Sequence, residues 1–259
     1  MRKLSPEKRA AIISALVEGN SIDSPCRIVG VSKVTVLRLL ADVGTFCAQY
    51  HNLIVRDLQS KRVQLDEIWS FCGCKDKAKD AGAGGHGSVW TWTAIDADSK
   101  LCISFLVSTR DVDAAVEFCT DVADRLANRV QLTSDGYNAY LQAVDVAFSG
   151  NVDYAKLVKI CWASDDDRKY SPAVCQGCKT EVQAGYPDEA HISTSFVERQ
   201  NLTLRMSTAD SLGSQMRSQK SWKTTLMQSH CTIFTTILSV SIKPSEQLQQ
   251  LQREPEQSA

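Results

Sequence analysis

VQLDEIW, at residues 63–69, is a short strand-like run that carries adjacent acidic residues. LTSDG, at residues 132–136, places an acidic residue after a similar run, and FVERQN, at residues 196–201, opens a stretch with helical character. The acidic residues that stand out in these motifs are Asp66, Asp135 and Glu198. Because they lie far apart in the sequence, only a fold can bring their carboxylates together. Three converging carboxylates suit a pair of divalent ions that cut and rejoin phosphodiesters, which predicts a DNA-processing enzyme.

The segment around the first two motifs alternates between strand-like and helix-like patterns. Strands are expected at residues 63–65, 89–95, 101–107 and 129–132, and helices at residues 112–127 and 137–144. Three strands, a helix, a strand and a helix describe the beginning of an RNase H-like fold, in which helices flank a mixed sheet. We therefore predict an α/β (α+β) protein with an RNase H-like catalytic core. That scheme has one acid on the first strand and another after the fourth, where Asp66 and Asp135 fall.

The third motif supplies the remaining candidate site residues. Glu198 opens a predicted helix, for which Ser193 or Ser195 is the expected cap. Arg205 lies two helical turns further along, on nearly the same face, where its guanidinium could bind a phosphate. The predicted catalytic residues are Asp66, Asp135, Glu198 and Arg205, and the three acids among them are the predicted ligands of Mg²⁺ or Mn²⁺.

Neighbouring acidic residues receive a different interpretation. Glu67 alternates to the opposite side of its strand, so we expect its side chain to be exposed. Asp96 and Asp98 precede Ser-Lys at the end of a strand, a pattern typical of a hairpin turn, although either is an alternative metal ligand.

The N-terminal sequence predicts three helices. Ser5 and Pro6 are suited to the start of the first helix, and Gly-Asn at residues 19–20 ends it. A second helix is expected at residues 24–29 and a third at residues 33–41. A helix, a glycine-containing turn and a capped helix form the helix-turn-helix arrangement of DNA-binding proteins.

The third of these helices would enter the major groove of DNA. Its predicted DNA-binding residues are Ser32, Lys33, Thr35 and Arg38, with Ser32 acting also as the helix cap. Any three short helices could resemble this arrangement, so packing alone is the competing interpretation. Residues 42–62 are expected to form a further amphipathic helix that connects to the core or supports dimerisation.

The charges are divided unevenly along the chain. Residues 1–62 hold ten Lys/Arg and five Asp/Glu, which gives +5, and the remainder holds nineteen and twenty-five, which gives −6. A basic head on an acidic body fits a nucleic-acid-binding module joined to a metal-dependent core. No run is long and apolar enough to span a membrane, and no signal peptide is evident, which predicts a cytoplasmic, nucleoid-associated protein.

The ten cysteines are interpreted as reduced thiols, because the context is not that of a small secreted chain. Two pairs invite a second hypothesis, a structural zinc site: Cys72, Cys74, Cys175 and Cys178. The single residue between the members of the first pair is tight for zinc, so loop or core thiols are the favoured interpretation. His86 lies in a glycine-rich stretch and is not expected to be a ligand.

The motifs together resemble the DDE transposases of the insertion-sequence-one family. The matching blocks are DEIW at residues 66–69, SDG at residues 134–136 and VERQNLTLR at residues 197–205. This resemblance implies transposition by strand cleavage and strand transfer at terminal inverted repeats, with Mg²⁺ as cofactor. It also implies double-stranded DNA as the partner, a homodimer or larger assembly on DNA, Asp66, Asp135 and Glu198 as the metal-binding triad, and Arg205 as the basic residue that follows it.

The resemblance stops near residue 207. The expected domains are a helix-turn-helix domain (1–44), a connecting helix (45–62), a catalytic domain (63–206) and a divergent tail (207–259). The tail is rich in Ser, Thr and Gln where the family has a basic, aromatic-rich helix. A frameshift near codon 208 is one explanation, and a natural amphipathic helix at residues 222–240 is the other.

Residues 207–213 are expected to fray or end the helix of Glu198, which predicts little or no transposition in vivo. The rival interpretation from another class is a non-catalytic helix-turn-helix regulator of the parent element, and a third is a metal-dependent nuclease that hydrolyses without joining.

Overall fold

The computed structural model describes residues 4–72, 87–162 and 174–213 of the 259-residue chain. The chain divides into two compact units. Of the described residues, the first unit contains those up to Val55, with 69–72, 87–90 and 200–213, and the second contains 56–68, 91–162 and 174–199. Within the described ranges, no helix has the length and apolar character that crossing a bilayer requires. Cys74, His86 and residues 222–240 lie outside these ranges. The zinc-site hypothesis and the tail-helix hypothesis, which depend on these residues, therefore also fall outside the described residues.

Three helices form the N-terminal part of the first unit, and their predicted order is confirmed. They are α1 (Pro6–Val17), α2 (Asp23–Val29) and α3 (Lys33–Ile54). The Ser5 side chain caps α1 by accepting a hydrogen bond from the Lys8 backbone amide. Gly30 follows α2 with φ of 69°, a left-handed conformation that glycine adopts without a Cβ clash.

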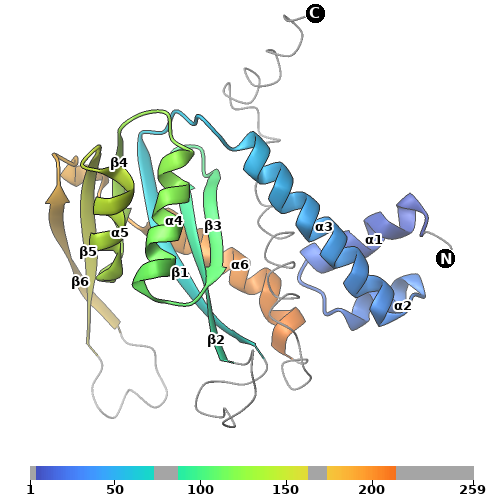
Figure 1. The fold of residues 1–259 in the computed structure, drawn as a ribbon. Coiled ribbons are helices and arrows are strands. Elements are labelled where there is room, and N and C mark those ends of the chain that lie inside the picture. The colour runs from blue at the N-terminus through green and yellow to red at the C-terminus, as the bar shows by residue number, and fades with distance from the viewer. Residues whose placement is uncertain (1–3, 73–86, 163–173, 214–259) are drawn as a thin grey trace, which may run out of the picture. The chain divides into compact units, whose positions relative to one another are not determined.

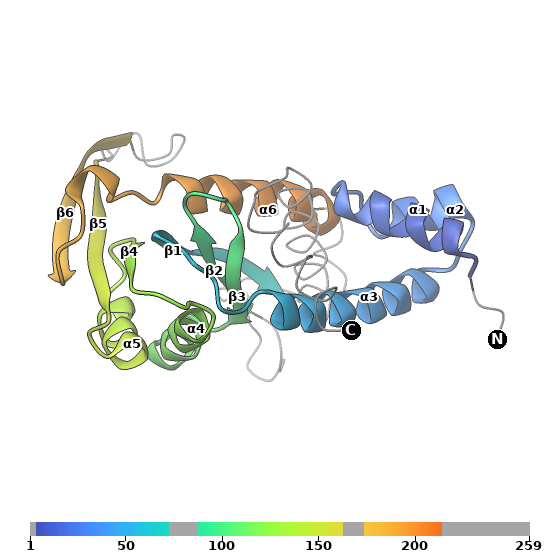
Figure 2. The ribbon, with the colours of Figure 1, turned by 90° about the horizontal axis from the view of Figure 1, so that it is seen from above.

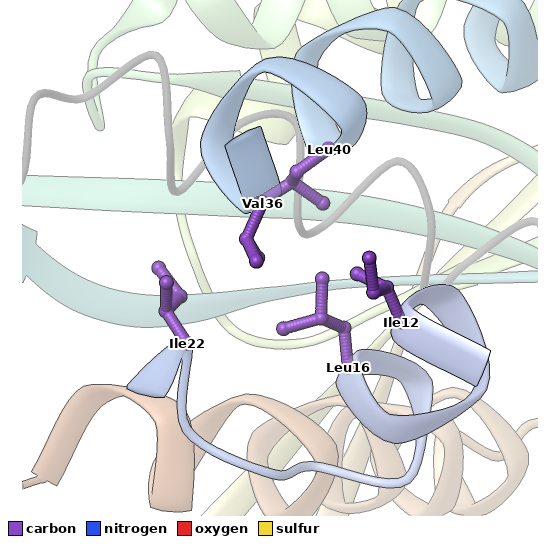
Figure 3. Packing of buried hydrophobic residues seen from close by; sticks show 5 residues of the cluster. All are labelled: Ile12, Leu16, Ile22, Val36 and Leu40. Atoms are coloured by element: carbon purple, nitrogen blue, oxygen red, sulfur yellow. The ribbon is translucent and has the colours of Figure 1, made fainter. Parts of the chain in front are cut away.

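A small apolar cluster joins the three helices (Figure 3). Its fully buried members are Ile12, Leu16, Ile22, Val36 and Leu40. Full burial of each such side chain contributes about 1.5–3 kcal/mol to folding. Apolar residues at helical spacing, Ile12 and Leu16 in α1 and Val36 and Leu40 in α3, therefore build the core of this head.

The prediction of a break between residues 41 and 42 is wrong, because α3 continues for 22 residues. The Ser32 side chain caps its start, accepting from the Thr35 amide, as expected. Nothing near Asp42 stops the helix: the segment contains no proline, and the one glycine, Gly44, is accommodated as a buried helical residue. The predicted connecting helix at 42–62 is thus the second half of α3, which ends at Ile54.

Six strands form one sheet (Figure 1). They are β1 (Arg62–Cys72), β2 (Gly87–Asp96), β3 (Cys102–Ser108), β4 (Val130–Ser134), β5 (Val152–Trp162) and β6 (Val174–Ala184). Their order across the sheet is β3-β2-β1-β4-β5-β6. β1 pairs in parallel with β4, β4 pairs in parallel with β5, and β6 is antiparallel to β5. The sheet is therefore mixed, as predicted.

Hydrogen bonds show that β2 runs antiparallel to β1. Thr93 donates to the carbonyl of Asp66, and the amide of Ala97 donates to the carbonyl of Arg62, so the partner number rises on one strand as it falls on the other. The predicted hairpin turn after β2 is confirmed. A carboxylate oxygen of Asp96 accepts from the Ser99 amide at 2.9 Å, which is a local turn-forming contact.

Helices α4 (Val112–Asp124) and α5 (Ala139–Phe148) lie on the same face of the sheet (Figure 2). Trp92 of β2 is fully buried beneath them and contacts the rings of Phe118 in α4 and Tyr140 in α5. Its indole nitrogen donates to the Thr109 carbonyl at 3.0 Å, so its one polar group is satisfied. One face of the sheet is thereby packed against helices.

The region after α5 contains elements that the sequence interpretation did not include. These are β5, β6 and the short 3₁₀ helix η3 (Glu189–His191). The final described helix, α6, spans Ser195–Gly213. It therefore includes all of residues 207–213, the segment that was expected to fray or end it, and it ends at the last of them, Gly213.

Candidate metal centre

The strand register places Asp66 and Asp135 beside each other. β1 and β4 are parallel neighbours, and Leu65 is paired with Ser134 at the end of their ladder. Asp66 is the next residue of β1, and Asp135 is the first residue after β4, so their side chains project from adjacent positions. The convergence follows from the register of the sheet.

Glu67 joins these two aspartates. Asp66, Glu67 and Asp135 can each offer one carboxylate oxygen such that all three oxygens lie within 4.8 Å of one another. The expectation that Glu67 is exposed is wrong: only 9% of the residue is accessible. It does lie on the opposite side of β1 from Asp66, as alternation requires, but helices α4 and α5 cover that side.

A hydrogen-bonded network holds Glu67 in place. The Arg110 guanidinium donates to its Oε1 through Nε at 2.8 Å and also through Nη2, and the Tyr140 hydroxyl donates to its Oε2 at 2.9 Å. Arg110 in turn stacks on the ring of Tyr137, 4.0 Å from its centroid. Both oxygens of the buried carboxylate are therefore satisfied, and its position is fixed by side chains from α5 and from the segment before α4.

The pKa of Glu67 is raised above the usual value for a glutamate. Burial is the largest cause, and the nearby negative charge of Asp135 adds to it. The hydrogen bonds and charge of Arg110, with the hydrogen bond from Tyr140, act in the opposite direction and only partly compensate. The cluster thus holds negative charge at close range, a condition that a bound cation would relieve.

Asp135 is oriented by the turn that follows β4. Its Oδ1 accepts a hydrogen bond from the Tyr137 amide at 3.0 Å, two residues further on. The preceding Ser134 is fully buried, and its hydroxyl lies 2.7 Å from that of Tyr154 on β5. The base of the turn is therefore fixed to the sheet, and the Asp135 carboxylate has a defined direction.

Glu198 lies in the first turn of α6, but it is not a member of the three-acid group among the described residues. Its carboxylate forms an ion pair with Lys159 of β5 and accepts a hydrogen bond from the Thr194 hydroxyl. The structure thus brings two of the three predicted acids together, adds Glu67, and gives Glu198 a separate partner.

The expected serine cap of α6 is replaced by a residue from β1. The Gln64 side-chain oxygen accepts hydrogen bonds from the amides of Phe196 at 2.9 Å and Val197 at 3.0 Å. These are the first-turn amides that lack partners within a helix. The Ser193 hydroxyl instead accepts a hydrogen bond from the amide of Ser195, which is not one of these two amides. Gln64 is buried, so the start of α6 is fixed to β1.

The other predicted site residues belong to the first unit. Arg205 is an exposed residue of α6. In the head, Ser32, Lys33 and Arg38 are exposed and Thr35 is half-buried. The Lys33 ammonium lies 3.1 Å from the carboxylate of Asp23, an exposed ion pair that a stronger anion could replace.

The residues of the acidic group fit a divalent cation. Their donors are carboxylate oxygens, the ligands that the hard ions Mg²⁺ and Mn²⁺ prefer. Oxygens that bind one such ion at about 2.1 Å lie about 3–4 Å apart, a spacing that the 4.8 Å limit includes. Asp66 and Asp135 are half-buried, so solvent could complete the coordination.

No protein-family model and no curated protein matches the sequence. Among solved structures, the chain has a distant likeness to a piggyBac transposase in a synaptic complex with hairpin DNA. The TM-score is 0.41 at 10% sequence identity, and the match covers 92% of this chain and 68% of the other. This score is too low to establish a common fold.

Proposed function

We propose that this chain is a DDE-type DNA transposase that cleaves and transfers strands at the ends of an insertion sequence, with Mg²⁺ or Mn²⁺ as cofactor. The observation that carries the proposal is that Asp66 in β1 and Asp135 directly after β4 follow the last paired residues of two adjacent parallel strands, with carboxylate oxygens within 4.8 Å of each other. Both lie where an RNase H-like core would place its first two acids. The motif resemblance to the insertion-sequence-one family supports the same assignment.

The chain's own residues would have distinct roles in this proposal. Asp66 and Asp135 hold the metal, and Glu198 is the third ligand once its carboxylate is available. When bound, the metal supplies Lewis-acid chemistry, lowering the pKa of the attacking hydroxyl or water and stabilising the leaving oxygen. Arg205 is proposed to bind a phosphate of the DNA.

The head is proposed to bind double-stranded DNA through α3. Ser32, Lys33, Thr35 and Arg38 gather at the start of that helix, and three of the four are exposed. The proposed division is a DNA-binding domain at 1–44, a connecting segment at 45–62 that is helical up to Ile54, a catalytic domain at 63–206 and a tail at 207–259. A homodimer or larger assembly on DNA belongs to the same proposal.

A strand-transfer assay with Mn²⁺ and duplexes that carry the element's terminal repeats tests this function. The variants are Asp66→Asn and Asp135→Asn, and Asp145→Asn is the matched control, because Asp145 is an exposed acid on α5. We expect the first two to abolish cleavage and joining and the control to retain both. Cleavage that survives in Asp66→Asn would refute the proposal. Cleavage without joining in the unchanged protein would indicate a hydrolytic nuclease.

One observation favours a second candidate, a non-catalytic regulator that binds DNA through the head. Glu198 is paired with Lys159 and stands outside the three-acid group. If the site cannot assemble, DNA binding would remain as the function. Such a regulator would bind the terminal repeats with unchanged affinity in Asp66→Asn and would show no metal-dependent cleavage in the unchanged protein.

A further inference from the structure

The ion pair between Lys159 and Glu198 joins the last parallel strand to the first turn of α6. Its lysine side chain is 43% exposed and its glutamate side chain 36% exposed. Exposed pairs of this kind contribute little to stability and exchange readily with other ions. The pair therefore does not need to persist when another cation approaches Glu198.

Strand alternation places Lys159 on the same face of the sheet as Asp66. Lys156 of β5 donates to Asn138, at the start of α5, so it lies on the helix-covered face. The ladder is regular between Ala155 and Ile160, so Lys159, three residues on, lies on the opposite face.

The same argument applies to β1. Glu67 contacts Tyr140 of α5, so Asp66 and Gln64 lie on the other face, and Gln64 there caps the start of α6. Asp66, Lys159 and the first turn of α6 thus share one face. Burial alone would lower the pKa of Lys159, but the hydrogen bond and charge of Glu198, with the charge of Asp66, raise it.

We propose that Lys159 is a positioning residue of the acidic site: its ammonium group holds Glu198 in the metal-free protein, and a divalent cation must displace it before Glu198 can become a ligand. This inference rests on the proposed metal-binding function. Lys159 would compete with the metal for the third carboxylate and so set the metal affinity. Glu198 would then join Asp66 and Asp135 only when the metal binds, and the three carboxylates would not be assembled beforehand.

A double-mutant cycle on Mn²⁺ affinity tests this idea in the full-length chain. Lys159→Met is measured alone and in a Glu198→Gln background, by calorimetric titration with Mn²⁺. We expect Lys159→Met alone to tighten Mn²⁺ binding about two- to fivefold, which corresponds to an exposed ion pair. In the Glu198→Gln background the same substitution should change the affinity far less, because the competing pair is already absent.

The matched control is Lys179→Met, because Lys179 is an exposed lysine on β6 that is ion-paired with Glu181. It removes the same charge from the neighbouring strand and should leave Mn²⁺ affinity unchanged. An unchanged or weaker affinity in Lys159→Met would overturn the proposal. So would an equal gain in both backgrounds, which would indicate a general charge effect. If Asp66→Asn does not weaken Mn²⁺ binding, the proposed metal site itself fails, and that result is distinct from the others.

Discussion

At the scale of single residues, the buried contact between Glu67 and Arg110 explains why the acidic site keeps its shape. The Glu67 side chain is 2% exposed, whereas that of Arg110 is 33% exposed. Removing the arginine leaves a buried carboxylate with only Tyr140 as a hydrogen-bond partner. We therefore expect Arg110→Ala to lower the free energy of unfolding by about 2–3 kcal/mol, less than a fully buried pair would lose.

Urea denaturation followed by circular dichroism measures this loss. Lys179→Ala, which removes an exposed ion pair, serves as the control and should change the free energy of unfolding by less than about 1 kcal/mol. Equal losses in the free energy of unfolding for the two substitutions would show that the contact between Arg110 and Glu67 stabilises the fold no more than an exposed ion pair does.

The raised pKa of Glu67 predicts a pH dependence with a definite sign. A raised pKa means that the folded state binds the proton more tightly than the unfolded state. The usual pKa of a glutamate is 4.5. As the pH rises from that value through the raised pKa of the folded state, the contribution of Glu67 to stability therefore falls. Glu67→Gln lacks this fall. Its stability relative to the unchanged protein, measured by urea denaturation with a chelator present, should be more favourable at pH 7 than at pH 4. The opposite trend would contradict the assignment.

At the scale of secondary-structure elements, Gln64 links β1 to α6 through two helix amides. Gln64→Met keeps the size of the side chain but leaves these amides without an acceptor. We expect a loss of about 1–3 kcal/mol in the free energy of unfolding. Amide hydrogen exchange at Phe196 and Val197 should also become faster. Gln142→Met, at an exposed position on α5, is the control and should change neither quantity.

The elements that the sequence predicted are those with a clear apolar pattern. α4 was predicted because its apolar side chains recur at helical spacing, and Phe118 and Val122 are indeed buried. β5 and β6 were missed because they carry lysines among their apolar residues, and β6 is largely exposed. In β5, Lys156 is buried and bonded to Asn138, a contact that no local pattern indicates.

The candidate site could be predicted only in part for the same reason. Asp66 and Asp135 closely follow the predicted strands at 63–65 and 129–132, and the parallel pairing of β1 with β4 brings them together. The burial of Glu67 depends on Arg110 and Tyr140, which come from distant parts of the chain. The cap of α6 likewise comes from Gln64, more than a hundred residues earlier. Contacts of this range have no signature in one sequence.

At the scale of the whole molecule, the uneven charge of the chain corresponds to a division of labour in the proposed function. The head and its connection, residues 1–62, carry +5, and the remainder carries −6. An acidic body disfavours DNA except where cations bind it, so the head must supply most of the attraction. The strength of that attraction should depend on salt.

Salt dependence gives a test of which residues of the head meet DNA. Each phosphate that a protein neutralises contributes about 0.9 to the slope of log affinity against log salt concentration. The double variant Lys33→Gln/Arg38→Gln should therefore lower that slope by up to about 1.8 on a mixed-sequence duplex, measured by fluorescence anisotropy. Lys8→Gln, an exposed residue of α1, is the control for the loss of a head charge. If Lys8→Gln lowers the slope as much per charge as the double variant does, the attraction comes from the net charge of the head. A smaller effect of Lys8→Gln would support α3 as the element that enters the DNA groove.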